Sequence, residues 1–501
     1  MKGKSFMRTI LATATVVVGL NSPAVELGAP FKDNMVLQRG MPVNIWGKAD
    51  AKQPVDIRFA GIRISTKADA AGSWLVKLPA MDAMKEPQVL TAGDAVVSNV
   101  LVGEVWIASG QSNMIVPLDG DANRFRDQDG RLLASHTQRS DVRLMTTPSV
   151  MATTEQRCWG KSTVKWMSVA PENLELQDFS AIGWRFAVGL RDALDVPVGV
   201  ILNAWNGSRI EGWIPPEGYA AVGLDPALPS AVYDAGGYGT PMSIWNGKVA
   251  PLAPMAFRGF LWYQGESNCN TAGYGPNRLG GITQYAKLLK ALYGGWKMRF
   301  GNPDVKMVLA GLATWGNGNE FLMNEEQQKF ADSEPNAAMT VLNDIGILGD
   351  IHGSDKARVA ERMLSLSLQH AYGYKLNAES PRFKSAKANG ALVTLSFSNA
   401  KRLRLWNMRE VALTTNFQLA GSDGRFYDAA IENFQVYTNA SGQTLLSKGN
   451  IVGSEIQLKS DHVLQPKFVR YLYCNRMGNV FNEMSLPLGA FSAKIEPTRA
   501  D

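Results

Sequence analysis

The sequence predicts an α/β protein with a parallel, three-layered core, preceded and followed by β-sheet segments. Two observations predict this fold class. In the middle of the chain, short apolar runs alternate with segments of helical periodicity, which is typical of a parallel sheet covered on both faces. In the first and last parts, short alternating runs separated by Gly, Pro, Asn and Asp turns replace the helical period. The 501 residues exceed what one core usually supports, so we expect several domains.

The middle domain is expected over residues 101–375. Its elements are short, nearly unalternating apolar strands and amphipathic helices. The strands are expected at 105–108, 198–203, 259–263, 306–310 and 339–343, and the helices at 181–194, 283–296, 324–333 and 356–371. Residues 119–180 are polar and weakly periodic, which favours a long insertion.

The flanking segments are expected to be β structure. Residues 25–100 form an N-terminal β domain, and residues 376–501 form a C-terminal β-sandwich or jelly roll. The C-terminal domain could share strands or an interface with the N-terminal one.

Residues 1–24 have the layout of a secretory signal peptide. Lys2, Lys4 and Arg8 precede the apolar run 10–20, which is too short to cross a bilayer. An anchored or disordered N-terminus is the alternative. We expect a periplasmic or secreted protein without membrane insertion after signal removal. The widely spaced Cys158, Cys269 and Cys474 form neither a disulfide framework nor a zinc site, although one pair could bridge.

Composition excludes some partners. Hydrophobic residues make up 45% and charged residues 19%, as in globular proteins. The net charge of +6 is small, and the basic residues are scattered. Nucleic acid is therefore not an expected partner, and a neutral substrate fits at least as well.

A serine follows the first strand of the middle domain, in the run Gly110-Gln111-Ser112-Asn113-Met114. Glycine permits a tight turn whose backbone N–H groups can stabilise an oxyanion. An ordinary turn with Ser112 as a helix cap is the alternative. Gly207 follows the second strand and could offer a further N–H. Gln264 or Asn268, after the third strand, could supply a side-chain amide donor.

A serine hydroxyl needs a base, and the chain has four histidines. His352 alone lies in a loop after the last strand, just before a helix, whereas the others lie elsewhere, at His136, His370 and His462. Asp350 is the nearest carboxylate that could orient the imidazole, and Asp344 is the second. A solvated loop histidine is the alternative. Four strand ends thus carry a serine, a glycine, an amide pair and a histidine, as an acyl-transfer site requires.

These motifs resemble the sialate O-acetylesterase family and its carbohydrate-esterase relatives in the SGNH-hydrolase superfamily. The resemblance rests on Gly-Gln-Ser-Asn-Met at 110–114, Trp-Tyr-Gln-Gly-Glu-Ser-Asn at 262–268 and Asp-Ile-His at 350–352. Residues 33–39 and 417–427 are also similar to that family, so the resemblance covers most of the mature chain.

The resemblance implies a flavodoxin-like hydrolase domain that removes O-acetyl groups from sugars through an acyl-enzyme, without a metal or other cofactor. It implies Ser112 as nucleophile and His352 as general base. It also implies an oxyanion hole made by the N–H groups of Ser112 and Gly207 with the amide of Gln264 or Asn268. The superfamily's aspartate stands three residues before the histidine, where this chain has Gly349. The acid therefore stays open between Asp350, Asp344 and a backbone carbonyl.

The expected substrate is an acetylated glycan. Sialic acid would need an arginine partner such as Arg124, Arg126 or Arg209. A neutral xylan or xyloglucan fragment would use aromatic platforms, and tryptophan-rich strand ends favour it; the available rings are Trp205, Trp213, Trp262, Tyr263 and Trp315. The expected substrate-binding residues are Gln111, Asn113, Trp205, Arg209 and Glu266, although Glu266 is better explained as a loop anchor than as an acid. An esterase for lipid or aryl esters and a catalytically decayed glycan-binding protein are the alternatives.

Overall fold

The structure, a computed structural model, describes residues 25–118, 137–160, 162–227, 240–271, 279–406, 415–438, 444–474 and 476–497. The expected signal peptide lies outside these residues, as do Arg124, Arg126 and His136. Within the described ranges, no helix is long and apolar enough to cross a membrane.

Five parallel strands form the centre of the molecule. They are β8 (Ala95–Gly110), β11 (Val198–Ala204), β12 (Gly259–Tyr263), β13 (Lys306–Ala310) and β14 (Ala337–Thr340). Their spatial order is β11-β8-β12-β13-β14, with every neighbouring pair parallel. Numbered among these five strands alone, this is the order 2-1-3-4-5 of a doubly wound sheet, whose reactive edge lies beyond the carboxyl ends of the strands. The α/β prediction is confirmed.

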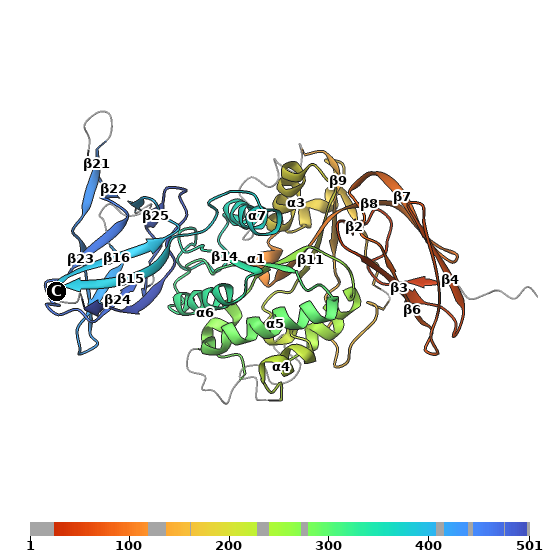
Figure 1. The fold of residues 1–501 in the computed structure, drawn as a ribbon, viewed down its shortest axis with the longest axis horizontal. Helices are drawn as coiled ribbons and strands as arrows, with labels where there is room; N and C mark the ends of the chain where they lie inside the picture. Colours follow the sequence, from red (N-terminus) through yellow and green to blue (C-terminus); the bar gives the residue numbers. More distant parts are fainter. Residues whose placement is uncertain are drawn as a thin grey trace, which may run out of the picture.

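Helices cover both faces of this sheet (Figure 1). On one face lie α3 (Ala181–Leu194) and α7 (Lys356–Tyr372), and on the other α4 (Pro216–Val222), α5 (Tyr285–Phe300) and α6 (Glu320–Ser333). The four expected helices are all present. The remaining helical turns are α1 (Ser112–Ile115), η1 (Leu174–Asp178), η2 (Ile210–Trp213), η3 (Trp245–Val249), η4 (Ala250–Leu252), η5 (Glu266–Thr271) and η6 (Ile282–Gln284).

The expected insertion at 119–180 is wrong for part of its length. Strand β9 (Arg139–Thr146) extends the central sheet parallel to β11, and β10 (Met167–Val169) pairs antiparallel with β9. Only four consecutive residues of β9 are buried, and Arg143 lies among them. Because a charged residue interrupts so short an apolar run, the sequence pattern did not indicate a strand.

The N-terminal β segment is continuous with the central sheet. The early part of β8 pairs with β7 and β2, whereas residues 104–110 pair with β11 and β12. The expected boundary at 100–101 therefore runs through one strand, and both parts share one hydrophobic core. The other strands here are β1 (Glu26–Leu27), β2 (Val36–Gln38), β3 (Val43–Lys48), β4 (Pro54–Phe59), β5 (Ile62–Lys67), β6 (Ser73–Leu78) and β7 (Met84–Ala92).

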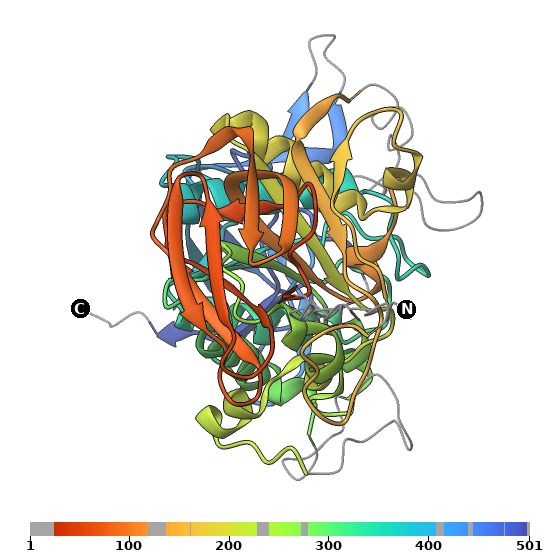
Figure 2. The same cartoon turned by 90° about the vertical axis from the view of Figure 1, so that its right-hand side faces the viewer.

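The C-terminal segment has its own core and lies at the opposite end of the molecule (Figures 1 and 2). The α/β part stands between the two β segments, so the expectation that they share strands is wrong for the described residues. The sheets are β20-β23-β16-β15-β27, β21-β22-β17-β25 and β19-β18-β24-β26. Their strands are β15 (Arg382–Asn389), β16 (Leu392–Ser398), β17 (Leu403–Trp406), β18 (Phe417–Ala420), β19 (Phe426–Asp428), β20 (Ala430–Ile431), β21 (Phe434–Thr438), β22 (Thr444–Ile451), β23 (Glu455–Lys459), β24 (Phe468–Tyr471), β25 (Val480–Asn482), β26 (Phe491–Lys494) and β27 (Glu496–Pro497).

Candidate active site

The serine and the histidine expected from the sequence meet at the carboxyl edge of the central sheet. Ser112 begins α1 directly after β8, and His352 lies in the loop between β14 and α7. His352 Nε2 lies 2.7 Å from Ser112 Oγ, although 240 residues separate the two. At this distance the imidazole can accept the hydroxyl proton, so the pair has the geometry of a nucleophile and its general base.

The turn that carries Ser112 requires glycine at position 110. Gly110 has φ +132°, and a Cβ there would lie 2.1 Å from the Tyr263 carbonyl oxygen. The turn is also bonded to both neighbouring strands. The Gln111 N–H donates to Tyr263 O at 2.9 Å, and the Trp205 N–H donates to Gly110 O at 2.9 Å. These two hydrogen bonds fix the serine turn to the ends of β12 and β11.

Two backbone N–H groups are available near the serine. The Ser112 N–H lies in the first turn of α1, where an N–H has no partner within its own helix. Gly207 is exposed and left-handed (φ +65°), and its N–H donates to no acceptor among the described residues. Ala204 of β11 pairs with Gly110 of β8, so the two groups follow paired residues at the same edge of the sheet.

The amide side chains of Gln264 and Asn268 are not available as oxyanion donors, so that prediction is wrong for this structure. Gln264 Nε2 lies 3.0 Å from Gln111 Oε1, from Asn268 Oδ1 and from a backbone carbonyl. Asn268 Nδ2 donates to Glu211 Oε2 at 3.0 Å and to another carbonyl. Both side chains are fully buried, and buried amides satisfy their donors internally.

Gln111 and Asn113, expected to bind substrate, are also framework residues. Each is 2% exposed. Gln111 Oε1 accepts the amide of Gln264 and two backbone N–H groups of the loop after β12. Asn113 donates to Glu266 Oε1 at 2.6 Å and to Ile351 O at 3.0 Å. The serine turn is thereby tied to two neighbouring loops, and Glu266 serves as an anchor, not as a substrate ligand.

Asp350 is the candidate acid that acts on His352. Its Oδ1 accepts the backbone N–H of His352 at 2.8 Å, and its charge raises the pKa of the imidazole. Two larger effects act in the opposite direction. Burial of the ring and the nearby Lys356 ammonium lower the pKa of His352 below its ordinary value of 6.5. The balance favours the neutral imidazole, which is the form that a general base needs.

Asp344, the alternative acid, has another partner. Both of its oxygens accept from the Arg362 guanidinium, each at 2.7 Å, and the Asp344 side chain is 1% exposed. This buried bidentate pair connects the beginning of the loop after β14 to α7. Asp344 therefore has the contacts of a structural residue.

Arg209 has no capacity for a substrate carboxylate, so its expected binding role is wrong. The side chain is 1% exposed, and its Nη2 and Nε lie 2.8 and 2.9 Å from Glu211 Oε1. The aromatic residues expected to bind sugar fall into a buried group and a partly exposed group. Trp213, Trp262 and Tyr263 belong to the core, with the Trp213 and Trp262 rings edge to face at 5.8 Å.

Trp205 and Trp315 remain partly exposed beside the candidate site. Trp205 follows β11, just before Gly207, and lines a cavity of about 350 Å³ together with Ile115. Trp315 follows β13, and its carbonyl accepts the N–H of Gly349 in the histidine loop at 2.8 Å. These two partly exposed rings follow β11 and β13, at the same edge of the sheet as Ser112.

Two buried lysines near the site were missed in the sequence. Lys248 lines the same cavity as Trp205, and burial lowers its pKa to about 7. Lys356 donates to Asn113 Oδ1 at 2.6 Å. A signal for Lys356 exists, because a lysine at the first position of a helix opposes the helix dipole. No local pattern marks Lys248.

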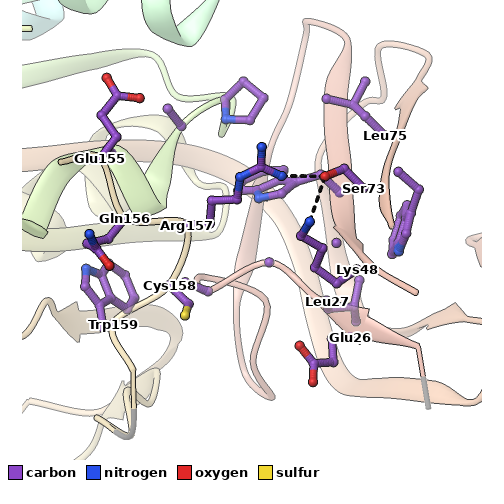
Figure 3. Close-up of a pocket in the computed structure, with 18 of the residues that line it drawn as sticks. Glu26, Leu27, Lys48, Ser73, Leu75, Glu155, Gln156, Arg157, Cys158 and Trp159 are labelled. Atoms are coloured by element: carbon purple, nitrogen blue, oxygen red, sulfur yellow. Dashed lines mark hydrogen bonds between the residues drawn. The ribbon is translucent and has the colours of Figure 1, made fainter. Parts of the chain in front are cut away.

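A separate cavity of about 830 Å³ lies between the N-terminal strands and the loop around Arg157 (Figure 3). Arg157 and Lys48 both donate to Ser73 Oγ there, and none of the expected site residues lines it. Cys158 lies on its wall, and all three cysteines are free thiols. Among the described residues, no group of His, Cys, Asp and Glu side chains could hold a metal ion.

A family model, known proteins and a solved structure all match this chain to carbohydrate acetylesterases. The family model of the carbohydrate esterases described as sialic acid-specific acetylesterases matches residues 102–369. A sialate O-acetylesterase from Homo sapiens is 34% identical over 178 residues, covering 35% of this chain and 33% of that protein. The sialate O-acetylesterase of Rattus norvegicus is 24% identical over 415 residues, covering 69% of this chain and 74% of that protein.

A solved structure is similar over nearly the whole chain. The crystal structure of a carbohydrate acetylesterase from Xanthomonas citri has a TM-score of 0.78 and 28% identity, and the match covers 94% of this chain and 99% of that one. The family model spans more than half of the chain and includes both Ser112 and His352. The chain therefore belongs to the carbohydrate esterase family of the sialic acid-specific acetylesterases.

Proposed function

We propose that this protein is a serine esterase that removes O-acetyl groups from carbohydrates. The observation that carries the proposal is the 2.7 Å contact between Ser112 Oγ and His352 Nε2 at the carboxyl edge of the sheet. Family membership supports the substrate class. The strand order 2-1-3-4-5 supports the further assignment of the α/β part to the flavodoxin-like SGNH type, with the flanking sheets as β-sandwich domains.

The reaction follows from the contacts. His352 accepts the Ser112 proton as Oγ bonds to the acetyl carbon, and the carbonyl π electrons move to oxygen. The N–H groups of Ser112 and Gly207 donate to this oxyanion. When the ester C–O bond breaks, His352 returns the proton to the sugar oxygen. Water then attacks the acetyl-serine in the same manner and releases acetate, which restores the serine.

A neutral acetylated oligosaccharide, from xylan or xyloglucan, is the substrate that we propose. Trp205 and Trp315 provide partly exposed rings at the same edge of the sheet as the serine, and Arg209 is held by Glu211. Acetylated sialic acid is the competing substrate, because it is named by the human and rat relatives.

The deciding experiment is a panel of acetate-release assays. Acetylated xylan and xyloglucan fragments are compared with O-acetylated sialic acid and with synthetic esters of increasing acyl length. Higher kcat/KM for the neutral fragments supports the proposal. Preference for sialic acid would reassign the sugar, and preference for long acyl chains would contradict a carbohydrate acetylesterase.

Export is also part of the proposal. The basic and apolar pattern of residues 1–24 supports a signal peptide and a periplasmic or secreted location. Expression of the full chain, followed by cell fractionation and N-terminal sequencing of the product, tests it. An uncleaved protein in the cytoplasm would contradict this part of the proposal alone.

The two candidate acids are expected to respond differently to amidation. Asp344→Asn leaves the buried Arg362 charge without its partner, so we expect a loss of about 3–5 kcal/mol in the free energy of unfolding but nearly unchanged kcat/KM in the folded enzyme. Asp350→Asn should instead lower kcat/KM, by about 10²–10⁴-fold, with little change in stability. Chemical denaturation and acetate release measure the two quantities, and the opposite pattern would make Asp344 the acid.

The pH dependence of kcat/KM should show an acid limb with its midpoint below pH 6.5. Burial and the Lys356 charge lower the pKa of His352 from 6.5, so the imidazole stays neutral further into the acid range. Activity is present above this pKa and is lost as the pH falls through it, because imidazolium cannot accept the serine proton. A midpoint above 6.5 in a pH-rate profile would contradict the expected direction.

A further inference from the structure

Three buried side chains form a hydrogen-bonded chain directly behind the serine and the histidine. They are Lys356, Asn113 and Glu266, which are 2%, 2% and 4% exposed. Lys356 Nζ donates to Asn113 Oδ1 at 2.6 Å, and Asn113 Nδ2 donates to Glu266 Oε1 at 2.6 Å. The lysine and the glutamate do not touch in this arrangement; the amide lies between them.

Asn113 also joins the two halves of the reactive pair. It follows Ser112 in the chain, and its Nδ2 donates to the carbonyl of Ile351, the residue before His352, at 3.0 Å. The amide can bond to this carbonyl only while its oxygen faces Lys356 and its nitrogen faces Glu266. Lys356 therefore selects the orientation of a side chain that ties the serine turn to the histidine loop.

The surroundings of Lys356 both disfavour and favour its positive charge. The residue occupies the first position of α7, where the helix dipole disfavours a cation, and its ammonium lies 5.7 Å from the centre of the Tyr263 ring. The acidic member of the same hydrogen-bonded series is Glu266, and burial raises the pKa of its carboxyl group. Glu266 Oε2 has no hydrogen-bond partner among the described residues, which fits a carboxyl that is drawn towards its neutral form.

The charged groups that act on the His352 ring come from its two sides. Asp350, from the same loop, favours the imidazolium, and Lys356, from the start of α7, disfavours it. Of these two, Lys356 has the larger influence on the pKa of His352. A lysine four residues after the base, at the start of the helix that follows, thus acts on the charge of the base through its own positive charge.

We propose that Lys356 is a positioning residue of the esterase site: held by Asn113, its buried ammonium orients the amide that connects the serine turn to the histidine loop, and its charge acts on His352. This inference rests on the proposed serine-hydrolase function. It adds a group that touches neither substrate nor reacting atoms and acts through Asn113 and through its electric field.

The test compares Lys356→Gln, Lys356→Arg and the control Lys375→Gln. Glutamine keeps a donor for Asn113 without the charge, arginine keeps the charge, and Lys375 is an exposed lysine just beyond α7 whose replacement changes the net charge equally. For each variant, the rate at which a fluorophosphonate labels Ser112 is measured against pH, beside kcat/KM for 4-nitrophenyl acetate. Labelling needs an activated serine but no sugar ester.

We expect the acid limb to move to higher pH in Lys356→Gln and to stay in place in Lys356→Arg and Lys375→Gln. An unmoved limb in a folded Lys356→Gln variant would overturn the inference, and so would an equal upward move in Lys356→Arg. If Lys356→Gln does not fold, NMR titrations of the His352 ring in the unaltered protein and in Lys356→Arg at increasing salt concentration decide. Because salt screens a charge but not burial, a midpoint that does not respond to salt would overturn the inference. Labelling of Ser112 without acetate release from any glycan would remove the proposed function and leave this inference testable.

Discussion

Replacing Ser112 with alanine is expected to lower kcat for acetate release by about 10⁶-fold, the loss seen when a serine hydrolase loses its nucleophile. The loss is expected because Ser112 Oγ lies 2.7 Å from His352 Nε2, and an alanine leaves His352 with no hydroxyl to deprotonate. Steady-state acetate release from the preferred glycan measures the effect, with the melting temperature as evidence of folding.

A matched control is Ser65→Ala on β5, an exposed serine in the N-terminal sheet whose hydroxyl donates to Asp56 Oδ1. It should keep the activity of the unaltered protein. Near-full acetate release by a folded Ser112→Ala variant would mean that another group attacks the ester, and the mechanism would be wrong.

Replacing His352 with alanine should have the second-largest effect, a loss of about 10⁴–10⁶-fold in kcat. Ser112 remains, but nothing takes its proton, since a hydroxyl is a weak nucleophile without a base. The same variant should also lose fluorophosphonate labelling at Ser112. This second readout separates loss of activation from loss of substrate binding.

His370→Ala is the control for this variant. His370 lies near the end of the same helix that follows His352, and its Nε2 lies 3.1 Å from Glu379 Oε1, away from the serine. The control should be labelled at the rate of the unaltered protein. Labelling of His352→Ala at that rate would show that the base is a different group.

Much of the fold could be predicted because its signal is local. The strands at 259–263 and 306–310 and the helix at 181–194 have the expected bounds, since apolar runs and helical periods are properties of neighbouring residues. Strand β9 could not be predicted, because Arg143 interrupts its apolar run. The boundary at 100–101 was misplaced for a related reason: β8 is one uninterrupted strand of 16 residues that changes partners along its length.

Within the site, the residues whose polar groups are already bonded to other buried side chains were the ones misjudged. Gln264 has the chemistry of an oxyanion donor, but its partner Gln111 comes from 153 residues away. Arg209 has the chemistry of a carboxylate ligand, but Glu211 already holds it in the core. Asn113 was expected to touch sugar, and it instead contacts Lys356, which is 243 residues further along the chain.

The sequence by itself determined the α/β architecture and the reactive pair, because strand order places successive strand ends at one edge and few residue types can serve as nucleophile and base there. Only the tertiary structure decided which polar groups are free to meet a substrate. Residue type sets how many hydrogen bonds a side chain can make, but burial and partners from remote segments set how many remain. That is why the N–H groups of Ser112 and Gly207 have no acceptor among the described residues, whereas the amides of Gln264 and Asn268 are bonded to other buried side chains.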